Sequence, residues 1–233
     1  MKLLTVIPAR GGSKGIPGKN RLWVHGKPLI AWTIECALGT EGLGRIVVNT
    51  DDAEILTIAQ GYKGVVAMRR PEHLAEDNTP ISEVIEHVLT QETAAGQGPY
   101  DAILLLQPTA PIREPRHIHG ALQALKPDVN AVISVVAMHD MHPARMYQMG
   151  DDLLLQPMIP DFELARRQDI PPAYYRNGSI YLVRAEAFRR QRSVMAKPAA
   201  GYEMEARLLL NIDEPRDMLI AAPLIAAWQD GRL

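Results

Sequence analysis

Short apolar segments alternate with segments of helical spacing from the start of the chain to about residue 136, and this alternation restricts the fold more than any other feature. A helix after each strand carries the chain back, so that the next strand starts in the same direction. The alternation therefore predicts an α/β fold with a mostly parallel sheet. The expected strands are 2–7, 45–49, 64–68, 102–106 and 131–136, and the expected helices between them are 28–38, 52–60, 80–90 and 115–125.

The alternation ends after the last of these strands, where an irregular segment rich in Met, Pro and Asp begins. A short strand at 179–183, a helix at 185–191 and a last helix at about 214–230 follow. A length of 233 residues fits one domain. We therefore expect a single domain over 1–233, in which a smaller subdomain at about 138–205 covers the site, forms an oligomer interface, or does both.

The overall composition is that of an ordinary globular domain, with 47% hydrophobic residues, 22% charged residues and a net charge of −2 at pH 7. This balance gives no general case for binding nucleic acid or a membrane surface. No segment approaches the ~20 apolar residues of a membrane span. The single cysteine, Cys36, excludes an internal disulfide and a thiolate metal cluster. The first strand leaves no room for a signal peptide before it, so we expect a cytoplasmic protein.

Polar and charged side chains gather just after the expected strands. Ligands of open α/β sheets bind outside the carboxyl ends of the strands, so these side chains are the first candidates for a site. The first strand ends at a basic loop, and an acidic residue, Asp213, stands just before the last helix. The segments concerned are 10–20, 49–52, 69–71, 107–113 and 210–215.

The basic loop at 10–20 reads Arg-Gly-Gly-Ser-Lys-Gly-Ile-Pro-Gly-Lys-Asn. Its four glycines let the backbone turn tightly and approach a ligand, and its cations Arg10, Lys14 and Lys19 favour a polyanion such as a nucleotide triphosphate. The glycine spacing does not fit the dinucleotide fingerprint, and Ser13 holds the position of the first glycine of a P-loop. The alternative interpretation is a flexible, solvated surface loop.

These segments together resemble one known family. The pattern Ile-Pro-Ala-Arg-x-Gly-Ser-Lys-Gly-x-x-x-Lys-Asn occupies 7–20, and Asn-Gly-x-Ile-Tyr occupies 177–181 at the end of a matching segment that spans 175–181. On these residues the chain resembles the acylneuraminate cytidylyltransferases, or CMP-sialic acid synthetases. The first pattern is shared with other nucleotidyltransferases, whereas the second is more specific to enzymes that handle nine-carbon keto-acid sugars. Further matching segments are 26–30, 49–51, 70–71, 106–109, 168–171 and 211–213.

The resemblance implies a Rossmann-like nucleotidyltransferase sheet with a smaller dimerisation or lid segment, and a homodimer. It implies that the anomeric hydroxyl of a sialic acid or related nonulosonic acid attacks the α-phosphate of metal-bound CTP, giving a CMP-sugar and pyrophosphate. Such a transfer needs neutralised charge and in-line geometry more than covalent help from the protein. The implied partners are CTP and a keto-acid sugar, and the implied cofactor is Mg²⁺ or Mn²⁺.

Carried over position by position, the resemblance assigns residues to catalysis, to the nucleotide, to the sugar and its carboxylate, and to the metal. An arginine fork suits a carboxylate, and one or two carboxylates suffice for Mg²⁺. The catalytic set is Arg10, Lys14, Lys19, Gln107 and Asp213; the nucleotide set is Arg10, Gly11, Ser13, Lys14, Lys19, Asn20, Arg70, Asp77 and Thr79; the sugar set is Gln107, Thr109, Arg145, Arg167, Asn177 and Tyr181; the metal set is Asp213 and Asn211.

The chain also departs from the family pattern. Asn211 stands where the family has its first aspartate, and Ala110 stands where a serine is usual. Two alternative functions therefore stay open: activation of another sugar, such as an eight-carbon keto-acid or a sugar phosphate, and a non-catalytic nucleotide-binding homologue. His139, Asp140 and His142 have the spacing of metal ligands, but a loop structure or the rim of the sugar pocket is the favoured interpretation.

Several candidate residues also have purely structural interpretations. Asp213 can be the N-cap of the last helix, because Asp is favoured at that position. Gln107 can satisfy the backbone of its own loop. Asp51 and Asp52 are expected to cap the helix that follows them, and Thr79 can cap the helix that begins next to it.

Overall fold

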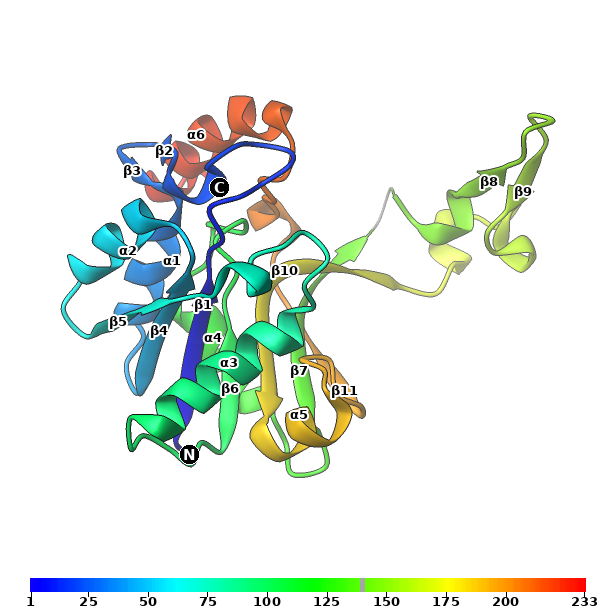
Figure 1. The fold of residues 1–233 in the computed structure, drawn as a ribbon. Coiled ribbons are helices and arrows are strands. Elements are labelled where there is room, and N and C mark those ends of the chain that lie inside the picture. Colours follow the sequence, from blue (N-terminus) through cyan, green and yellow to red (C-terminus); the bar gives the residue numbers. More distant parts are fainter. Residues whose placement is uncertain (139–140) are drawn as a thin grey trace.

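The computed structural model describes residues 1–138 and 141–233. A seven-stranded sheet runs through the main body, with the strand order β11-β7-β10-β6-β1-β4-β5 (Figure 1). All paired neighbours in this sheet are parallel except β10, which runs antiparallel to β6 and to β7. The expected mostly parallel α/β sheet is confirmed. The strands are β1 Leu3–Pro8, β4 Arg45–Thr50, β5 Val65–Arg69, β6 Ala102–Leu105, β7 Ala131–Met138, β10 Ala173–Arg184 and β11 Ala199–Glu203.

Helices cover both faces of the sheet, and each face has its own hydrophobic core (Figure 1). On one face α1, α2 and α4 bury Ile34, Ile55 and Ile118, and on the other α3 and α5 bury Val88 and Phe188. The last helix, α6, packs on the short β2–β3 hairpin. None of the described helices combines the length and apolar character that a membrane span requires. The bounds are α1 Leu29–Leu38, α2 Ala53–Gln60, α3 Ile81–Ala94, α4 Pro115–Ala124, α5 Ala185–Gln191, α6 Pro215–Gln229, β2 Trp23–Val24 and β3 Lys27–Pro28.

The order of the strands reverses between β1 and β6. From β1 the chain moves outward through β4 to β5, and it then returns to place β6 on the other side of β1. Loops that follow strands on the two sides of such a reversal diverge and leave a crevice between them. The topology therefore places a site at the carboxyl ends of β1 and β6.

The expected helices match the structure closely, and the largest difference is at the end of α3. This helix continues to Ala94, whereas the polar segment 91–99 predicts a loop. The cause is Glu92, which is 1% exposed and accepts hydrogen bonds from Tyr100 Oη at 2.6 Å and from Arg45 Nε at 2.8 Å. A buried carboxylate with two such partners extends the helix past the point where its polarity suggests an end.

The residues at the helix starts follow the expectations in part. Asp52 is the N-cap of α2, as expected, and its carboxylate accepts the two backbone N–H groups of the first turn. Asp51 was expected to share this task but does not: it accepts the backbone N–H of Gly11 at 3.0 Å and so ties the basic loop to the end of β4. The expectation for Thr79 is also wrong, because Pro80 occupies the N-cap position of α3 and the Thr79 hydroxyl donates to the carbonyl of His73.

Two strands differ from the expectations because tertiary pairing decides them. The expected strand at 179–183 is the end of β10, which already begins at Ala173. The edge strand β11 lies in a segment expected to be irregular, since its sequence Ala-Ala-Gly-Tyr-Glu has little strand preference. Pairing with β7 holds it in extended form.

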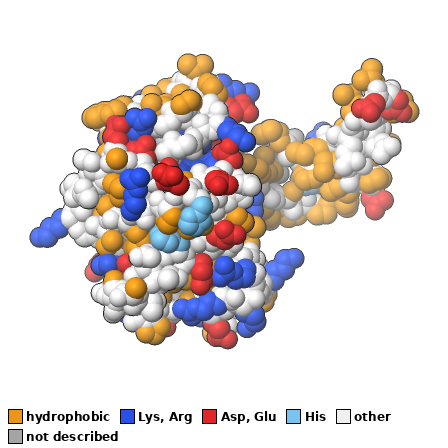
Figure 2. Space-filling view, in the orientation of Figure 1, with side chains coloured by type: hydrophobic (Ala, Val, Ile, Leu, Met, Phe, Trp, Pro, Cys, Tyr) orange, Lys and Arg blue, Asp and Glu red, His pale blue; other side chains and the backbone are white. Residues whose placement is uncertain are grey.

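Between β7 and β10 the chain leaves the main body as a narrow extension, which ends in the hairpin β8 Tyr147–Met149 and β9 Leu155–Pro157 (Figure 1). Within the range 138–205 of the expected subdomain, β10 and β11 pair in the seven-stranded sheet of the main body. Hydrophobic side chains are exposed along the extension (Figure 2). They include Met141, Met149, Leu153, Leu154, Leu155, Met158 and Leu164.

His142 has a structural role at the base of the extension. It is 7% exposed, its Nδ1 accepts from the backbone of Ala144 at 3.0 Å, and its Nε2 donates to the carbonyl of Pro171 at 2.9 Å. The ring therefore connects the outgoing and returning segments, in agreement with the favoured loop interpretation. His139 and Asp140 lie outside the described residues. In the described part of the chain, no group of three or more His, Cys, Asp or Glu side chains could hold a metal ion.

Candidate active site

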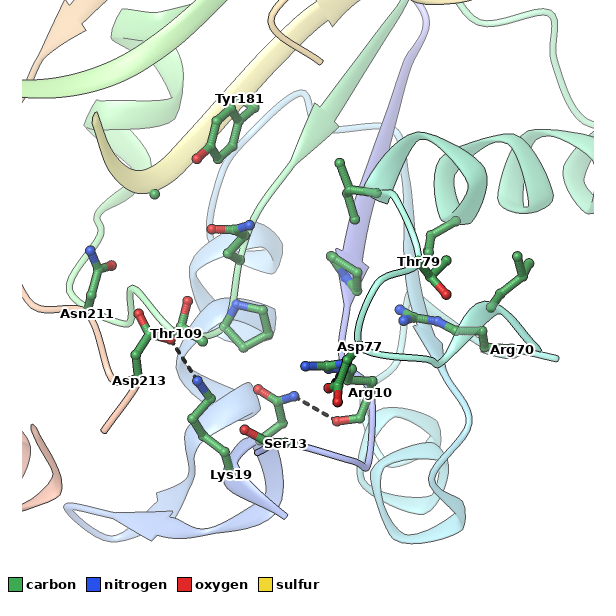
Figure 3. Close-up of a pocket in the computed structure, with 18 of the residues that line it drawn as sticks. Arg10, Ser13, Lys19, Arg70, Asp77, Thr79, Thr109, Tyr181, Asn211 and Asp213 are labelled. Carbon is green, nitrogen blue, oxygen red and sulfur yellow. Dashed lines mark hydrogen bonds and ion pairs between the residues drawn. The ribbon is translucent and has the colours of Figure 1, made fainter. Parts of the chain in front are cut away.

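A cleft of about 470 Å³ opens at the carboxyl ends of β1 and β6, where the topology places a site (Figure 3). Its walls come from five separate parts of the chain: the basic loop, the segment after β5, the segment after β6, the middle of β10 and the segment before α6. Most of the residues that the sequence analysis assigns therefore converge. Those that line the cleft are Arg10, Ser13, Lys19, Asn20, Arg70, Asp77, Thr79, Gln107, Thr109, Tyr181, Asn211 and Asp213.

The basic loop packs directly against the segment before α6. At Gly15 a Cβ atom would overlap the backbone oxygen of Asp213, so no side chain fits there. At Gly12, by contrast, a Cβ would meet no atom within 4 Å. The side-chain amide of Asn20 donates to the carbonyl of Arg10 at 3.1 Å and joins the two ends of the loop. The loop is thus a packed segment rather than the solvated surface loop of the alternative interpretation.

Carboxylates neutralise all three cations of the loop. Asp77 bridges Arg10 Nη1 at 2.7 Å and Lys14 Nζ at 2.9 Å, and Asp213 Oδ1 lies 2.8 Å from Lys19 Nζ (Figure 3). The hydrogen bond from Lys14, together with the charge of Arg10, holds the pKa of Asp77 below its usual range. The loop is therefore arranged to hold anionic oxygens, which carboxylates supply in the free protein.

Arg70 forms a fixed positive group on the neighbouring wall. It is 5% exposed and donates from Nε to Asn49 Oδ1 and from Nη2 to the Asn49 carbonyl, both at 2.8 Å. Burial lowers its pKa to about 10, so the guanidinium stays charged at neutral pH. Leu74, Ile81 and Val84 line the same part of the cleft. Apolar surface beside a fixed donor suits a flat polar group such as a nucleobase.

On the opposite wall, Gly178 lets the backbone of β10 approach two side-chain amides. Its φ is +72°, and a Cβ there would lie 3.2 Å from Gln107 Oε1 and 3.4 Å from Asn211 Oδ1. Among the described residues, no hydrogen bond joins the Gln107 side chain to the backbone of its own loop, so the structural interpretation of Gln107 finds no support. Tyr181 completes this wall, and burial raises the pKa of its phenol.

A buried arginine supports this wall from behind. Arg113 is 1% exposed, and it donates to the carbonyl of Ser179 at 2.7 Å and to the hydroxyl of Thr33 at 3.0 Å. These bonds join the segment after β6 to β10 and to α1. Burial lowers the pKa of the guanidinium, and in the described part of the chain no carboxylate forms an ion pair with it. Its hydrogen bonds therefore fix the position of the segment after β6 relative to β10 and α1.

The helix-cap interpretation of Asp213 is wrong. The N-cap of α6 is Glu214, and Asp217 completes the capping box. Asp217 Oδ2 accepts the backbone N–H groups of Asp213 and Glu214, each at 2.8 Å. The side chain of Asp213 is thus left free of the helix, 66% exposed and directed at Lys19 on the edge of the cleft (Figure 3).

Four assigned residues whose side chains the structure describes do not line the cleft. Gly11 and Lys14 belong to the basic loop, and Lys14 is 82% exposed. Asn177 is buried, and its Oδ1 accepts from a serine hydroxyl of β7 at 2.6 Å, so it supports the wall from inside. Arg145 is exposed on the extension. Arg167 begins the short helix Arg167–Asp169 of the extension, and its side chain lies outside the described part of the structure.

The sequence analysis gave no role to three polar residues of the cleft, which are Glu76, Tyr175 and Arg176, although the last two lie in the matching segment 175–181. Glu76 comes directly before Asp77 in a segment whose pattern shows no strand or helix. Arg176 stands directly before the Asn-Gly-x-Ile-Tyr pattern, a position that could have attracted attention. Its direction, however, depends on the irregular pairing of β10 with β7.

Comparison with known proteins identifies the family. A family model described as cytidylyltransferase matches residues 4–214. The chain belongs to this family. This cytidylyltransferase is therefore a nucleotidyltransferase enzyme, and the cleft at the carboxyl ends of β1 and β6 is its candidate active site.

The cytidylyltransferase is 33% identical over 233 residues to the CMP-N,N'-diacetyllegionaminic acid synthase of Legionella pneumophila, with 99% of both chains covered. It is 32% identical to the N-acylneuraminate cytidylyltransferase of Escherichia coli, covering 94% of this chain and 51% of that protein, so it spans about half the length of this relative. A solved structure of CMP:2-keto-3-deoxy-manno-octonic acid synthetase complexed with CTP is also similar, with a TM-score of 0.73 and 22% identity over 98% of this chain and 100% of that chain. At this identity the likeness shows the fold alone, and it confirms the nucleotidyltransferase sheet.

A substitution at Gly15 tests whether catalysis needs the basic loop to pack on the backbone of Asp213. Gly15→Ala is expected to lower kcat/KM for nucleotidyl transfer by about 100-fold, because a shift of about 1 Å in positioning groups has this effect. The added methyl group must displace the backbone of Asp213. Initial rates of pyrophosphate release measure the effect.

Gly12→Ala is the matched control, because the same methyl group meets open space in the same loop. Its rate is expected to stay within a few-fold of the wild type, and the melting temperatures of both variants show whether the fold is intact. Equal activity of the two variants would show that the packing of the loop on Asp213 does not matter for catalysis.

Proposed function

We propose that this cytidylyltransferase transfers CMP from CTP to the anomeric hydroxyl of a sialic acid or related nonulosonic acid and releases pyrophosphate. The observation that carries the proposal is one continuous cleft with two chemically different sides. One side offers the basic loop and Arg70 to a nucleotide, and the other offers Gln107 and Tyr181 to a sugar. The names of the Legionella and Escherichia relatives support the same substrate class.

The residues of the cleft and of the basic loop match what the reaction needs. The α-phosphorus exchanges its bond to pyrophosphate for a bond to the sugar oxygen, and negative charge grows on the leaving group. Arg10, Lys14 and Lys19 neutralise this charge by replacing their present carboxylate partners with phosphate oxygens. Arg70 holds the cytidine end through a fixed guanidinium. Gln107 and Thr109, at the end of β6, stand between the nucleotide and the sugar.

We further propose that Asp213, with Asn211 as a weaker ligand, holds Mg²⁺ or Mn²⁺. Both side chains line the cleft, and a carboxylate with an amide oxygen is a donor set that hard cations accept. Asp213 is 66% exposed, so its carboxylate can serve a metal when phosphate oxygens take its place on Lys19. When bound, such an ion neutralises triphosphate charge and helps to activate the α-phosphorus.

A homodimer and a cytoplasmic location belong to the proposal. The extension exposes apolar side chains, and a two-fold pair is the commonest way to cover such a surface. Arg145, assigned to the sugar, lies on this extension rather than in the cleft of its own chain. A cytoplasmic location is supported by the single cysteine, Cys36, which is buried and leaves no internal disulfide.

A pyrophosphate-release assay with four nucleoside triphosphates and a panel of acceptors tests the function. Release is expected with CTP and a nine-carbon acid, such as an N-acylneuraminic, legionaminic or pseudaminic acid. An eight-carbon keto-acid and a sugar phosphate are the competing acceptors. Faster turnover with either of these, or with another triphosphate, would replace the proposed substrate class, and no turnover with any pair would favour a non-catalytic homologue.

The metal proposal predicts opposite effects of two substitutions. Asp213→Asn leaves two neutral amides and is expected to lower the rate by about 100-fold or more, with partial recovery at high Mg²⁺. Asn211→Asp adds a carboxylate and is expected to lower the Mg²⁺ concentration needed for half the maximal rate. Titration of Mg²⁺ against initial rate measures both. An unchanged metal dependence in Asp213→Asn would place the metal elsewhere.

The dimer proposal predicts a solution mass of twice the 25.8 kDa chain. Light scattering at assay concentration measures it. Replacing Leu154 and Leu155 of the extension by serine is expected to weaken the dimer, because both side chains are more than half exposed in one chain and apolar. A wild-type monomer at assay concentration would contradict the proposal.

A further inference from the structure

Asn49 is a buried polar residue in an apolar stretch of the sheet. It lies at the end of β4, between Pro8 of β1 and Met68 of β5, and it is fully buried. Val47, two positions earlier on the same face, packs in the hydrophobic core beside α3. The Nδ2 atom of Asn49 is buried and has no hydrogen-bond partner within residues 1–138 and 141–233. Because an unpaired buried donor costs stability, this side chain calls for an explanation other than packing.

The acceptor groups of Asn49 hold one edge of the Arg70 guanidinium. The N–H groups of Nε and Nη2 point in the same direction along this edge. They donate to Oδ1 and to the backbone carbonyl of Asn49, each at 2.8 Å. The same carbonyl accepts the N–H of Ala9 at 3.0 Å, and the backbone N–H of Arg70 donates to the carbonyl of Thr50 at 2.8 Å. Both ends of the arginine side chain are therefore fixed to β4.

The other edge of the guanidinium is left for a ligand. It carries one N–H of Nη1 and the second N–H of Nη2, which form a fork of two parallel donors. In the part of the chain that the structure describes, no hydrogen bond engages Nη1. Arg70 points into the cleft, where Leu74 and Val84 line the same wall (Figure 3). A fork held in one direction beside apolar surface suits the polar edge of a flat ring.

Nearby charges would turn this fork if nothing held it. Burial has the largest effect on the pKa of Arg70 and lowers it; the charge of Asp51 raises this pKa, and the charge of Arg10 lowers it. A guanidinium free to rotate would follow these charges, toward Asp51 and away from Arg10. Asn49 is neutral, so it holds the fork in place without cancelling its charge.

Cytosine and uracil differ at the edge that such a fork meets. Cytosine presents two neighbouring acceptors, N3 and O2, whereas uracil presents O2 beside an N3–H group, which is a donor. Two fixed donors therefore bond to cytosine and oppose uracil. A site built in this way discriminates strongly, because the wrong base leaves polar groups unpaired. A guanidinium that turns away from this direction loses the discrimination.

We infer that Asn49 is a positioning residue that directs the Arg70 fork at the base and thereby sets the preference for CTP over UTP. The inference rests on the proposed function, which places the cytidine at Arg70, and it adds a residue that does not itself line the cleft. It also explains the unpaired Nδ2 atom, because the amide is kept for the neutral acceptor that it offers to Nε.

The test measures the preference for cytosine in single variants. With the best acceptor sugar of the panel, this preference is the inhibition constant of UTP divided by the KM for CTP, a ratio that needs no turnover of UTP. Asn49→Ala is expected to lower the ratio by about 10- to 100-fold, the range for one lost contact to a charged group, and to leave KM for the sugar nearly unchanged. Asn49→Asp restores the acceptor and is expected to recover most of the ratio.

A double variant shows whether Asn49 acts through Arg70. Arg70→Met removes the fork, so adding Asn49→Ala to it is expected to change the ratio no further. Thr5→Ala is the matched control, because Thr5 is also a fully buried polar residue of the sheet whose side-chain oxygen has no partner among the described residues, and it does not line the cleft. This control should keep the wild-type ratio.

The outcomes separate the role of Asn49 from the proposed function. A wild-type ratio in Asn49→Ala, an equal loss in Thr5→Ala, or an equal further loss in the Arg70→Met background overturns the role of Asn49 while the proposed function stands. If the wild type turns over no keto-acid sugar with CTP, the proposed function itself fails. Should Asn49→Ala melt early, Asn49→Leu fills a similar volume without an acceptor, and a wild-type ratio there overturns the role as well.

Discussion

Neutralisation of the basic loop is the constraint on which the rest of the site depends. Arg10, Lys14 and Lys19 stand close together in one loop, and like charges held this close repel one another. Asp77 and Asp213 come from distant segments and supply the opposite charge. The ion pairs therefore bring three parts of the chain to one cleft. They also leave the loop with carboxylate partners that the oxygens of a phosphate group can replace.

Close backbone approach is the second requirement, and two glycines meet it. Gly15 lets the basic loop lie on the backbone of Asp213, and Gly178 lets β10 lie on the amides of Gln107 and Asn211. A side chain at either position would push a wall of the cleft outward. The distances between the walls of the cleft thus depend on the absence of two Cβ atoms as well as on the charged groups.

Buried polar groups make the framework around the cleft rigid. Arg113 connects the segment after β6 to β10, and the amide of Asn177 accepts from Ser134 of β7. Glu92, near the amino ends of β4 and β6, binds Arg45 and Tyr100. Buried groups of this kind are costly unless each finds its partners, so they specify one arrangement of the strands. The cleft is built on strands that cannot shift easily relative to one another.

The sequence by itself determined the α/β class, the parallel strands and the basic loop, because these depend on local periodicity and on the strand-end rule for ligands. Most of the assigned residues of the cleft followed from the resemblance to a known family. Only the tertiary structure decided which groups face the cleft. The helix-capping role expected for Asp213 passed to Glu214 and Asp217, and Asn177 turned inward while Arg176 turned outward. For Asn177 and Arg176 the reason is the irregular pairing of β10 with β7, which sets the direction of each side chain. Because these strands are far apart in the sequence, no local pattern predicts that pairing.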